Sequence, residues 1–262
     1  MRRTALLVVA LSLLTLLPGS SGAAPSLSAA RVAAADDQHS DCSMFVPAQQ
    51  SLGQLPTTRT SPSVRLDVLV VTEKRLLPTV RESVALAARS YADLGIVLAP
   101  RYQLVRAVPD LDADSQAYVD WLTSLFRDRR PRGADVVYLA TDRYIGAAGQ
   151  ADCIGGIAQD DHAFAVGMTT LGGLVGVNIE GLGIPAIEPP VKDGGALLIV
   201  HEIGHLLGAH HHYGGACAHG RSVDDPTRPC DVMLTVLTQQ TGLRFGPVNA
   251  AVVRDHAERY AR

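Results

Sequence analysis

Residues 201–211 read His-Glu-Ile-Gly-His-Leu-Leu-Gly-Ala-His-His, which is the pattern H-E-x-x-H-x-x-G-x-x-H. On a helix, His201 and His205 lie one turn apart on the same face, so both imidazoles can reach one metal ion. Gly208 lies where the helix must stop and turn, because glycine tolerates a positive φ. The chain can then return and bring His211 up as a third ligand. Three nitrogen ligands leave the fourth zinc position open, which is the geometry of a catalytic site.

Glu202 follows the first histidine and is expected to project beside the metal, where a base for a zinc-bound water belongs. Residues 196–200 before the motif are apolar, as are Ile203, Leu206 and Leu207 within it. We therefore expect a helix that is sunk in the core and turns its ligands toward a cleft. A buried His-Glu-His cluster without a metal would carry a large desolvation cost, so incidental histidines are a poor explanation of the pattern.

The eleven-residue pattern is similar to that of the metzincin metallopeptidases. Their second signature, a methionine in a tight turn below the zinc, is matched by Cys230-Asp231-Val232-Met233-Leu234, with Met233 as the Met-turn candidate. This turn and the segment before the zinc helix are most similar to adamalysin-like (reprolysin) members, although residue 212 is His where these usually have Asp. The resemblance implies one catalytic zinc ion, a protein or peptide substrate, and an apolar floor formed by Met233.

The strand pattern predicts a mixed sheet with packed helices, an α+β fold in which strands and helices largely alternate. The metzincin resemblance implies the same sheet, a small irregular C-terminal subdomain, and zinc in the cleft between them. We expect strands at 64–71, 134–140, 163–168 and 173–179, and a second strand or a bent pair over 96–98 and 102–108. Helices are expected at 78–92, 114–126 and 247–260, besides the zinc helix.

In the metzincin family, the short strand before the zinc helix is the antiparallel edge of the sheet. An exposed edge strand offers unpaired N–H and C=O groups that an extended peptide can join. In this sequence we expect that edge to be formed by Ala163, Phe164, Ala165, Val166, Gly167 and Met168.

The first 23 residues have the pattern of a signal peptide: a basic start, an apolar run over 5–17, and small residues at Ser21 and Ala23. Cleavage after Ala23 is expected. The apolar run is short for a membrane span, and later apolar runs are interrupted, so the mature protein is expected to be exported without stable membrane insertion. Residues 24–62 read as a flexible extension or short pro-segment, and 63–262 as one catalytic domain.

The 262-residue chain has a formal net charge of −3. Removing residues 1–23 deletes two arginines and no acidic residue, which leaves 21 basic against 26 acidic residues, a net charge of −5. No basic patch is left to neutralise phosphates, so nucleic acid is not an expected partner.

The four cysteines are Cys42, Cys153, Cys217 and Cys230. An even count in an exported chain favours two disulfides. Cys217 and Cys230 bracket the loop before the Met-turn, so a bond between them would pin that turn, and Cys42 and Cys153 then pair by elimination. Alternatively, Cys42 blocks the zinc as a thiolate from a pro-segment, which would leave Cys153 unpaired.

The sequence as a whole predicts a secreted zinc metalloendopeptidase in which Glu202 is the general base. A second interpretation is a secreted, His-rich zinc-binding protein with little turnover. The two differ in their use of Glu202, because a protein that only holds metal does not need a carboxylate at that position.

Overall fold

The structure is a computed structural model that describes residues 63–170, 193–211, 230–234 and 241–262 in full, and the backbone of 40–41, 217–218 and 221–222. All of the described residues belong to one compact unit, Ala35–Arg262. The expected signal peptide, the expected strand at 173–179 and most of the segment 24–62 lie outside the described residues.

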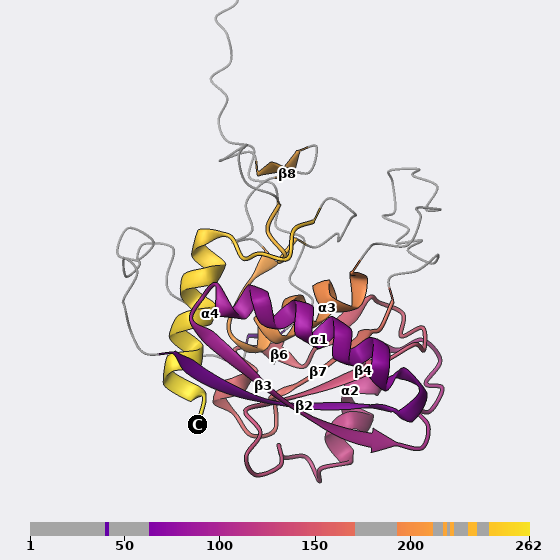
Figure 1. The fold of residues 1–262 in the computed structure, drawn as a ribbon. Helices are drawn as coiled ribbons and strands as arrows, with labels where there is room; N and C mark the ends of the chain where they lie inside the picture. Colours follow the sequence, from indigo (N-terminus) through magenta and orange to yellow (C-terminus); the bar gives the residue numbers. More distant parts are fainter. Residues whose placement is uncertain are drawn as a thin grey trace, which may run out of the picture. The chain divides into compact units, whose positions relative to one another are not determined.

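A five-stranded mixed sheet forms the centre of the described chain, with the strand order β3-β2-β4-β7-β5 (Figure 1). The first four of these strands run parallel, and β5 pairs antiparallel with β7 at one edge. The bounds are β2 (Val64–Glu73), β3 (Ile96–Val105), β4 (Val136–Thr141), β5 (Gly149–Ala151) and β7 (Phe164–Met168).

Helices cover both faces of this sheet because its strands are apolar on both sides. On β2, Val68 and Val70 belong to one core cluster, whereas Leu69 and Val71 belong to the other. The first cluster includes buried residues of α1 (Leu77–Ala92) and α3 (Gly194–Leu206), and the second those of α2 (Ser115–Ser124). The sheet is therefore the middle of three layers, and α3 lies on the same face as α1.

Local signals set the helix starts. Pro78 and Pro247 lie in the first turns of α1 and of α4 (Pro247–Tyr260), where a missing N–H costs nothing. The Asp114 side chain accepts a hydrogen bond from the Ala117 N–H at 3.1 Å and so caps α2. Three of the predicted helices thus form close to their expected positions.

Short elements complete the described chain. They are the two-stranded pairs β1 (Ser40–Asp41) with β6 (Cys153–Ile154) and β8 (Cys217–Ala218) with β9 (Arg221–Ser222), and the 3-10 helices η2 (Lys74–Leu76) and η3 (Gly156–Ala158).

The predicted fold class, a mixed sheet with packed helices, is confirmed. Residues 96–108, expected as a second strand or a bent pair, contain the single ten-residue strand β3. Pro100 lies within it, and a proline is tolerated there because β3 is an edge strand.

The prediction that Ala163, Phe164, Ala165, Val166, Gly167 and Met168 form the antiparallel edge is wrong. These residues correspond to β7, which lies between β4 and β5 and runs parallel to β4. The antiparallel edge is β5. An apolar run such as β7 is typical of an interior parallel strand whose two faces are both buried, whereas the three residues of β5 carry too little pattern to be recognised.

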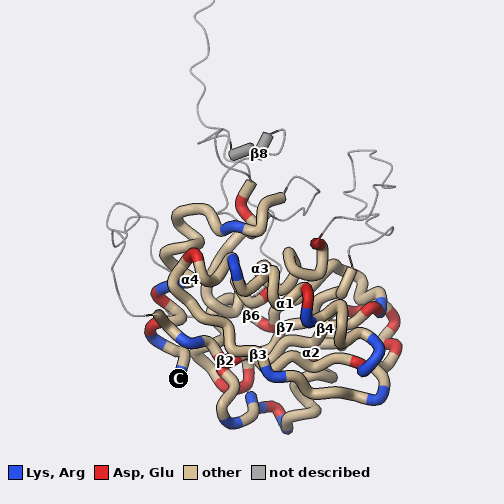
Figure 2. Tube along the Cα trace, viewed as in Figure 1, with Lys and Arg blue, Asp and Glu red and all other residues tan. Residues whose placement is uncertain are grey.

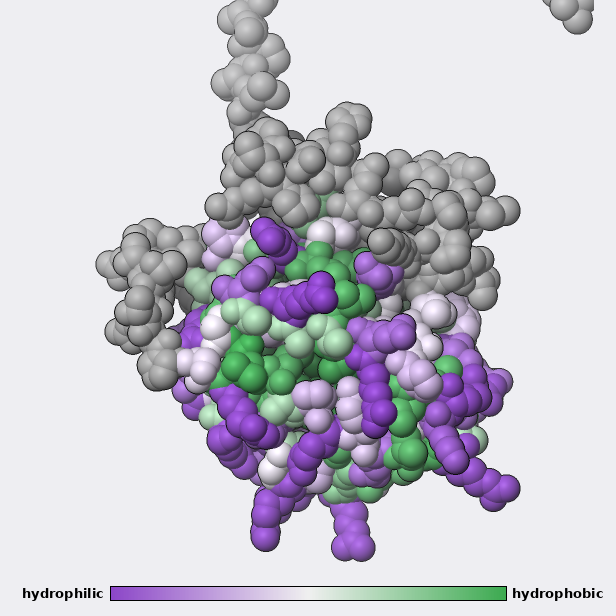
Figure 3. All heavy atoms as spheres, viewed as in Figure 1, coloured by the Kyte–Doolittle hydropathy of each residue, from purple (hydrophilic) through white to green (hydrophobic). Residues whose placement is uncertain are grey.

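The outer surface is mixed in charge. Basic and acidic residues alternate around the described part of the chain in Figure 2. On the face shown in Figure 3, hydrophobic residues gather in the middle and hydrophilic side chains project along the lower rim. Within the described part of the chain, no helix is long and apolar enough to cross a membrane.

Candidate metal centre and its surroundings

Helix α3 carries the first two histidines of the motif and is buried along its whole length. It ends at Leu206, and the Ala209 N–H then bonds to the Gly204 carbonyl at 2.9 Å. Gly208 follows the helix with a φ of +84°, a conformation that L side chains rarely adopt. The chain therefore turns back at the glycine where the sequence predicts it to turn.

The turn brings three imidazoles together. The Nε2 atoms of His201, His205 and His211 are 3.0 to 3.2 Å apart in all three pairs. Tetrahedral zinc with nitrogen ligands at its usual bond length would place these atoms about 3.3 Å from each other. The spacing of the three Nε2 atoms thus fits three corners of a tetrahedron around zinc. Among the described residues, these three histidines form a cluster that could hold a metal ion.

Backbone carbonyls orient two of these rings. The Nδ1 of His201 is 2.7 Å from the Val232 carbonyl, and the Nδ1 of His205 is 2.8 Å from the Ala209 carbonyl. A carbonyl can only accept, so each Nδ1 carries the proton and each Nε2 keeps its lone pair for a metal. The donor set and its protonation therefore fit a zinc ion.

The motif spacing predicts His211, and not the neighbouring histidines, as the third ligand, and the structure agrees. His211 supplies the third Nε2, whereas the His210 side chain is not part of the triad. The backbone N–H of His210 instead bonds to Oδ1 of Asn249 in α4 at 3.0 Å. His212 lies outside the described residues.

The predicted Met-turn lies against α3. A Cβ on Gly204, between the two helical histidines, would come within 2.9 Å of the Met233 sulfur. Met233 is fully buried, and the carbonyl of the preceding Val232 is the one that orients His201. The residues of the turn thus contact both the helix and one ligand, as expected of a floor under the site.

A buried polar network joins this turn to α4. The Asp231 carboxylate accepts hydrogen bonds from the Met233 N–H at 2.9 Å and from the Asn249 amide at 2.9 Å, and also from the Gly246 N–H. Burial raises the pKa of Asp231, and these hydrogen bonds oppose the rise. Asn249 bonds both to Asp231 in the Met-turn and to the backbone N–H of His210. It therefore links the Met-turn to the segment that carries the third histidine, His211.

Glu202 is also buried, with 3 % of its surface exposed. Its carboxylate accepts a hydrogen bond from the Ala151 N–H in β5, while Oε2 has no partner among the described groups. Burial raises the pKa of Glu202 well above its usual value. A carboxylate with one open oxygen and a raised pKa is suited to take up a proton.

Neither Cys153 nor Cys230 has a free thiol. The backbone of Ser40–Asp41, which directly precede Cys42 in the sequence, pairs in parallel with Cys153–Ile154. The side chains of Cys42 and Cys217 lie outside the described residues, so the two disulfide pairings remain predictions.

Sequence reasoning missed two contributors to this region, Asn249 and the short strand β5. Asn249 is one polar residue in an amphipathic helix, and nothing nearby in the sequence marks it as buried. β5 occupies three residues of a Gly/Ala-rich segment, which reads as a loop.

Comparison with known families agrees with this geometry. Residues 84–212 match the family described as metallo-peptidase family M12B, reprolysin-like. This segment is similar to the reprolysin-like metallopeptidases. The match includes Glu202 and all three histidines, and it ends before the Met-turn. It confirms the metzincin resemblance drawn from the motif, and a metallopeptidase is the class of protein to which the histidine triad fits.

None of the curated proteins matches the sequence. Among solved structures, an archaemetzincin from Methanopyrus kandleri is similar at 15 % identity and a TM-score of 0.47, over 78 % of this chain and 100 % of that one. A chain from a structure described as a chaperone–substrate complex is similar at 17 % identity and a TM-score of 0.48. That match covers 77 % of this chain and 36 % of the other, so this chain spans about a third of it.

Proposed function

We propose that this protein is an exported, zinc-dependent endopeptidase in which Glu202 is the general base. The observation that carries the proposal is the position of a buried carboxylate on the same helix as two of the three histidines, with one oxygen lacking a partner. A family match alone indicates a peptidase, whereas this carboxylate indicates a means of proton transfer.

Each residue has a distinct role in the proposed reaction. His201, His205 and His211 would hold one zinc ion, which supplies Lewis acidity and acidifies a water ligand. Glu202 takes the proton from the attacking water and passes it to the leaving amine of the peptide. The Ala151 N–H holds the carboxylate while this proton moves.

The substrate is proposed to bind along β5. This strand is the antiparallel edge of the sheet, and one side of its backbone has no neighbouring strand within the described sheet. An extended peptide can add to such an edge through main-chain hydrogen bonds. Because β5 also contacts Glu202, a peptide bound there passes close to the proposed base.

Export and the disulfides belong to the same proposal. Residues 1–23 would be removed after Ala23, and Cys217–Cys230 and Cys42–Cys153 would form in the oxidising environment outside the cell. Mass mapping of the exported protein under non-reducing conditions tests both points. A Cys42–Cys217 or Cys42–Cys230 linkage would contradict the pairing, and an N-terminus upstream of residue 24 would contradict the cleavage site.

The decisive experiment is Glu202→Gln, measured on peptides chosen from a cleavage-site library. Glutamine keeps the shape but cannot accept the proton, so hydrolysis should fall by at least about 10²-fold, as expected for a lost general base. Zinc content should stay at one per chain. Glu82→Gln, a change at an exposed position of α1, is the matched control and should leave turnover unchanged.

The alternative function, a zinc-binding protein without turnover, predicts no functional loss from Glu202→Gln and several weak zinc sites. Unchanged turnover in a fully zinc-loaded Glu202→Gln variant would refute the proposed mechanism.

A further inference from the structure

Two glycines face each other in the sheet beneath α3. Gly149 in β5 is paired with Gly167 in β7. Directly paired residues of neighbouring strands point to the same side of the sheet. A Cβ on Gly167 would lie 3.3 Å from the Leu198 Cβ, and one on Gly149 would meet Glu202. Because Leu198 and Glu202 are four residues apart, one face of α3 lies along the two glycines.

The contact at Gly149 involves the proposed base itself. A Cβ there would lie 2.3 Å from Oε1 of Glu202, 2.7 Å from Cδ and 2.8 Å from Cγ. All three separations are shorter than real Cβ contacts allow, so the carboxyl group occupies the space that any other residue would fill. Two residues along the same strand, the Ala151 N–H donates a hydrogen bond to the carboxylate.

We propose that Gly149 is a positioning residue for Glu202, an inference that rests on the proposed function. Because Gly149 has no side chain, the Glu202 carboxyl group fits beside it. The Ala151 N–H holds the carboxyl group in that position through a hydrogen bond. The edge strand on which a peptide would bind therefore also sets the place of the group that handles the proton. The φ of Gly149 lies outside the left-handed region, so the constraint at 149 comes from the space that the Glu202 side chain takes and not from the backbone conformation.

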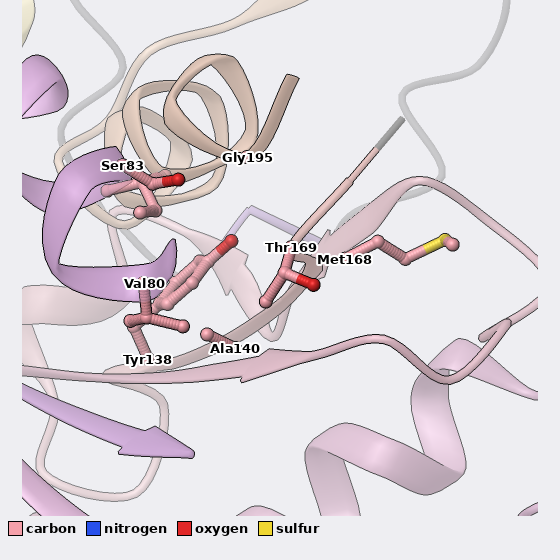
Figure 4. A pocket seen from close by; sticks show the side chains of 8 residues that line it. Val80, Ser83, Tyr138, Ala140, Met168, Thr169 and Gly195 are labelled. Atoms are coloured by element: carbon pink, nitrogen blue, oxygen red, sulfur yellow. The ribbon is translucent and has the colours of Figure 1, made fainter. Parts of the chain in front are cut away.

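Gly167 provides a matched control in the same layer of the sheet. A Cβ on it would lie 2.0 Å from the hydroxyl oxygen of Tyr138, a buried group without a partner among the described residues. Figure 4 shows Tyr138 reaching from β4 toward Ser83 of α1 and Gly195 of α3. Gly167→Ala thus creates a clash of the same kind, at a residue that does not handle protons.

The first test compares kcat and KM of zinc-loaded Gly149→Ala and Gly167→Ala. Displacing a reacting group by about 1 Å can cost 10²-fold in rate, so Gly149→Ala should lower kcat by at least about tenfold. Its KM should stay within about threefold of wild type and its zinc content should remain at one per chain. Gly167→Ala should lower the melting temperature with a near-normal kcat, and added Tyr138→Phe should recover part of that loss. Wild-type kcat in Gly149→Ala would overturn the proposal.

The second test needs no activity and no metal. The melting temperature of the metal-free protein is measured for wild type, Gly149→Ala, Glu202→Ala and the double variant. If the Glu202 carboxyl group fills the space at 149, Gly149→Ala should lower the melting temperature by several degrees in wild type and by little in the Glu202→Ala background. Equal losses in both backgrounds would overturn the proposal. Should Gly149→Ala fail to fold, recovery of folding in the double variant still supports it and continued failure overturns it.

The two proposals fail in different experiments. Unchanged turnover by zinc-loaded Glu202→Gln refutes the general base, whereas the melting temperatures of the four metal-free variants report only whether Glu202 occupies the space beside Gly149.

Discussion

Replacing Asn249 with alanine should weaken both the fold and the metal site. The Asn249 side chain is fully buried and makes two hydrogen bonds, at 3.0 Å from the His210 N–H and at 2.9 Å to the Asp231 carboxylate. The first is worth about 1 kcal/mol and the second, to a charged group, about 2 kcal/mol, so the variant should lose roughly 3 kcal/mol of unfolding free energy. For a chain of this size that is a drop of about 6–12 °C in melting temperature.

The same change should reduce zinc affinity. Asn249 holds the backbone just before His211, and through Asp231 it holds the Met-turn whose Val232 carbonyl orients His201. Loss of groups that support metal ligands typically costs 10- to 100-fold in affinity, and we expect about tenfold because Asn249 acts through one intervening residue on each side.

The assay is competition with a chromophoric chelator for zinc affinity, together with thermal unfolding of the metal-free protein. Asp255→Asn on the same helix is the control, because its ion pair with Arg259 is exposed and worth little. A variant that melts lower but binds zinc with wild-type affinity would show that Asn249 only stabilises the fold. An unchanged melting temperature would refute the hydrogen-bond reasoning altogether.

Three further predictions follow from single features. Gly208→Ala should destabilise the protein by more than the roughly 1–2 kcal/mol cost of a left-handed residue, since its Cβ would also lie 2.6 Å from the His256 ring; chemical denaturation measures this loss, and a loss below 1 kcal/mol would contradict it. Arg75 lowers the pKa of Asp142 from its usual value of 3.8, so the stability this pair contributes is present above that pH and is lost as the pH falls through the lowered pKa; Asp142→Asn should be less stable than wild type at pH 7, and the difference should shrink as acid is added, in urea titrations at pH 7 and at acid pH. Removal of zinc should lower the melting temperature, and zinc at 100 times its dissociation constant should restore about 2.7 kcal/mol, as calorimetry can show.

Local patterns were sufficient for the helices and the ligand set. The four-residue spacing of His201 and His205 places them on one helix face whatever surrounds them, and Gly208 marks the turn through its own backbone freedom. The starts of α2 and α4 are likewise marked by Asp114 and Pro247, which act on residues within one helical turn. These features follow from the sequence because the interactions that produce them are between near neighbours along the chain.

Strand order and the buried contacts around the site depended on the tertiary structure. An apolar run such as Phe164–Met168 fits an interior strand and an edge strand equally well, and only pairing with β4 and β5 decides between them. The contact between Gly149 and Glu202 joins residues that are 53 positions apart in the sequence. The hydrogen bond between Asn249 and Asp231 joins residues that are 18 positions apart. Such contacts form only when the sheet, α3 and α4 pack together, so they cannot be predicted from the local periodicity of the sequence. Local spacing along the chain is therefore enough to identify the residues that can bind a metal, whereas the packing of distant segments decides which groups hold those residues in place.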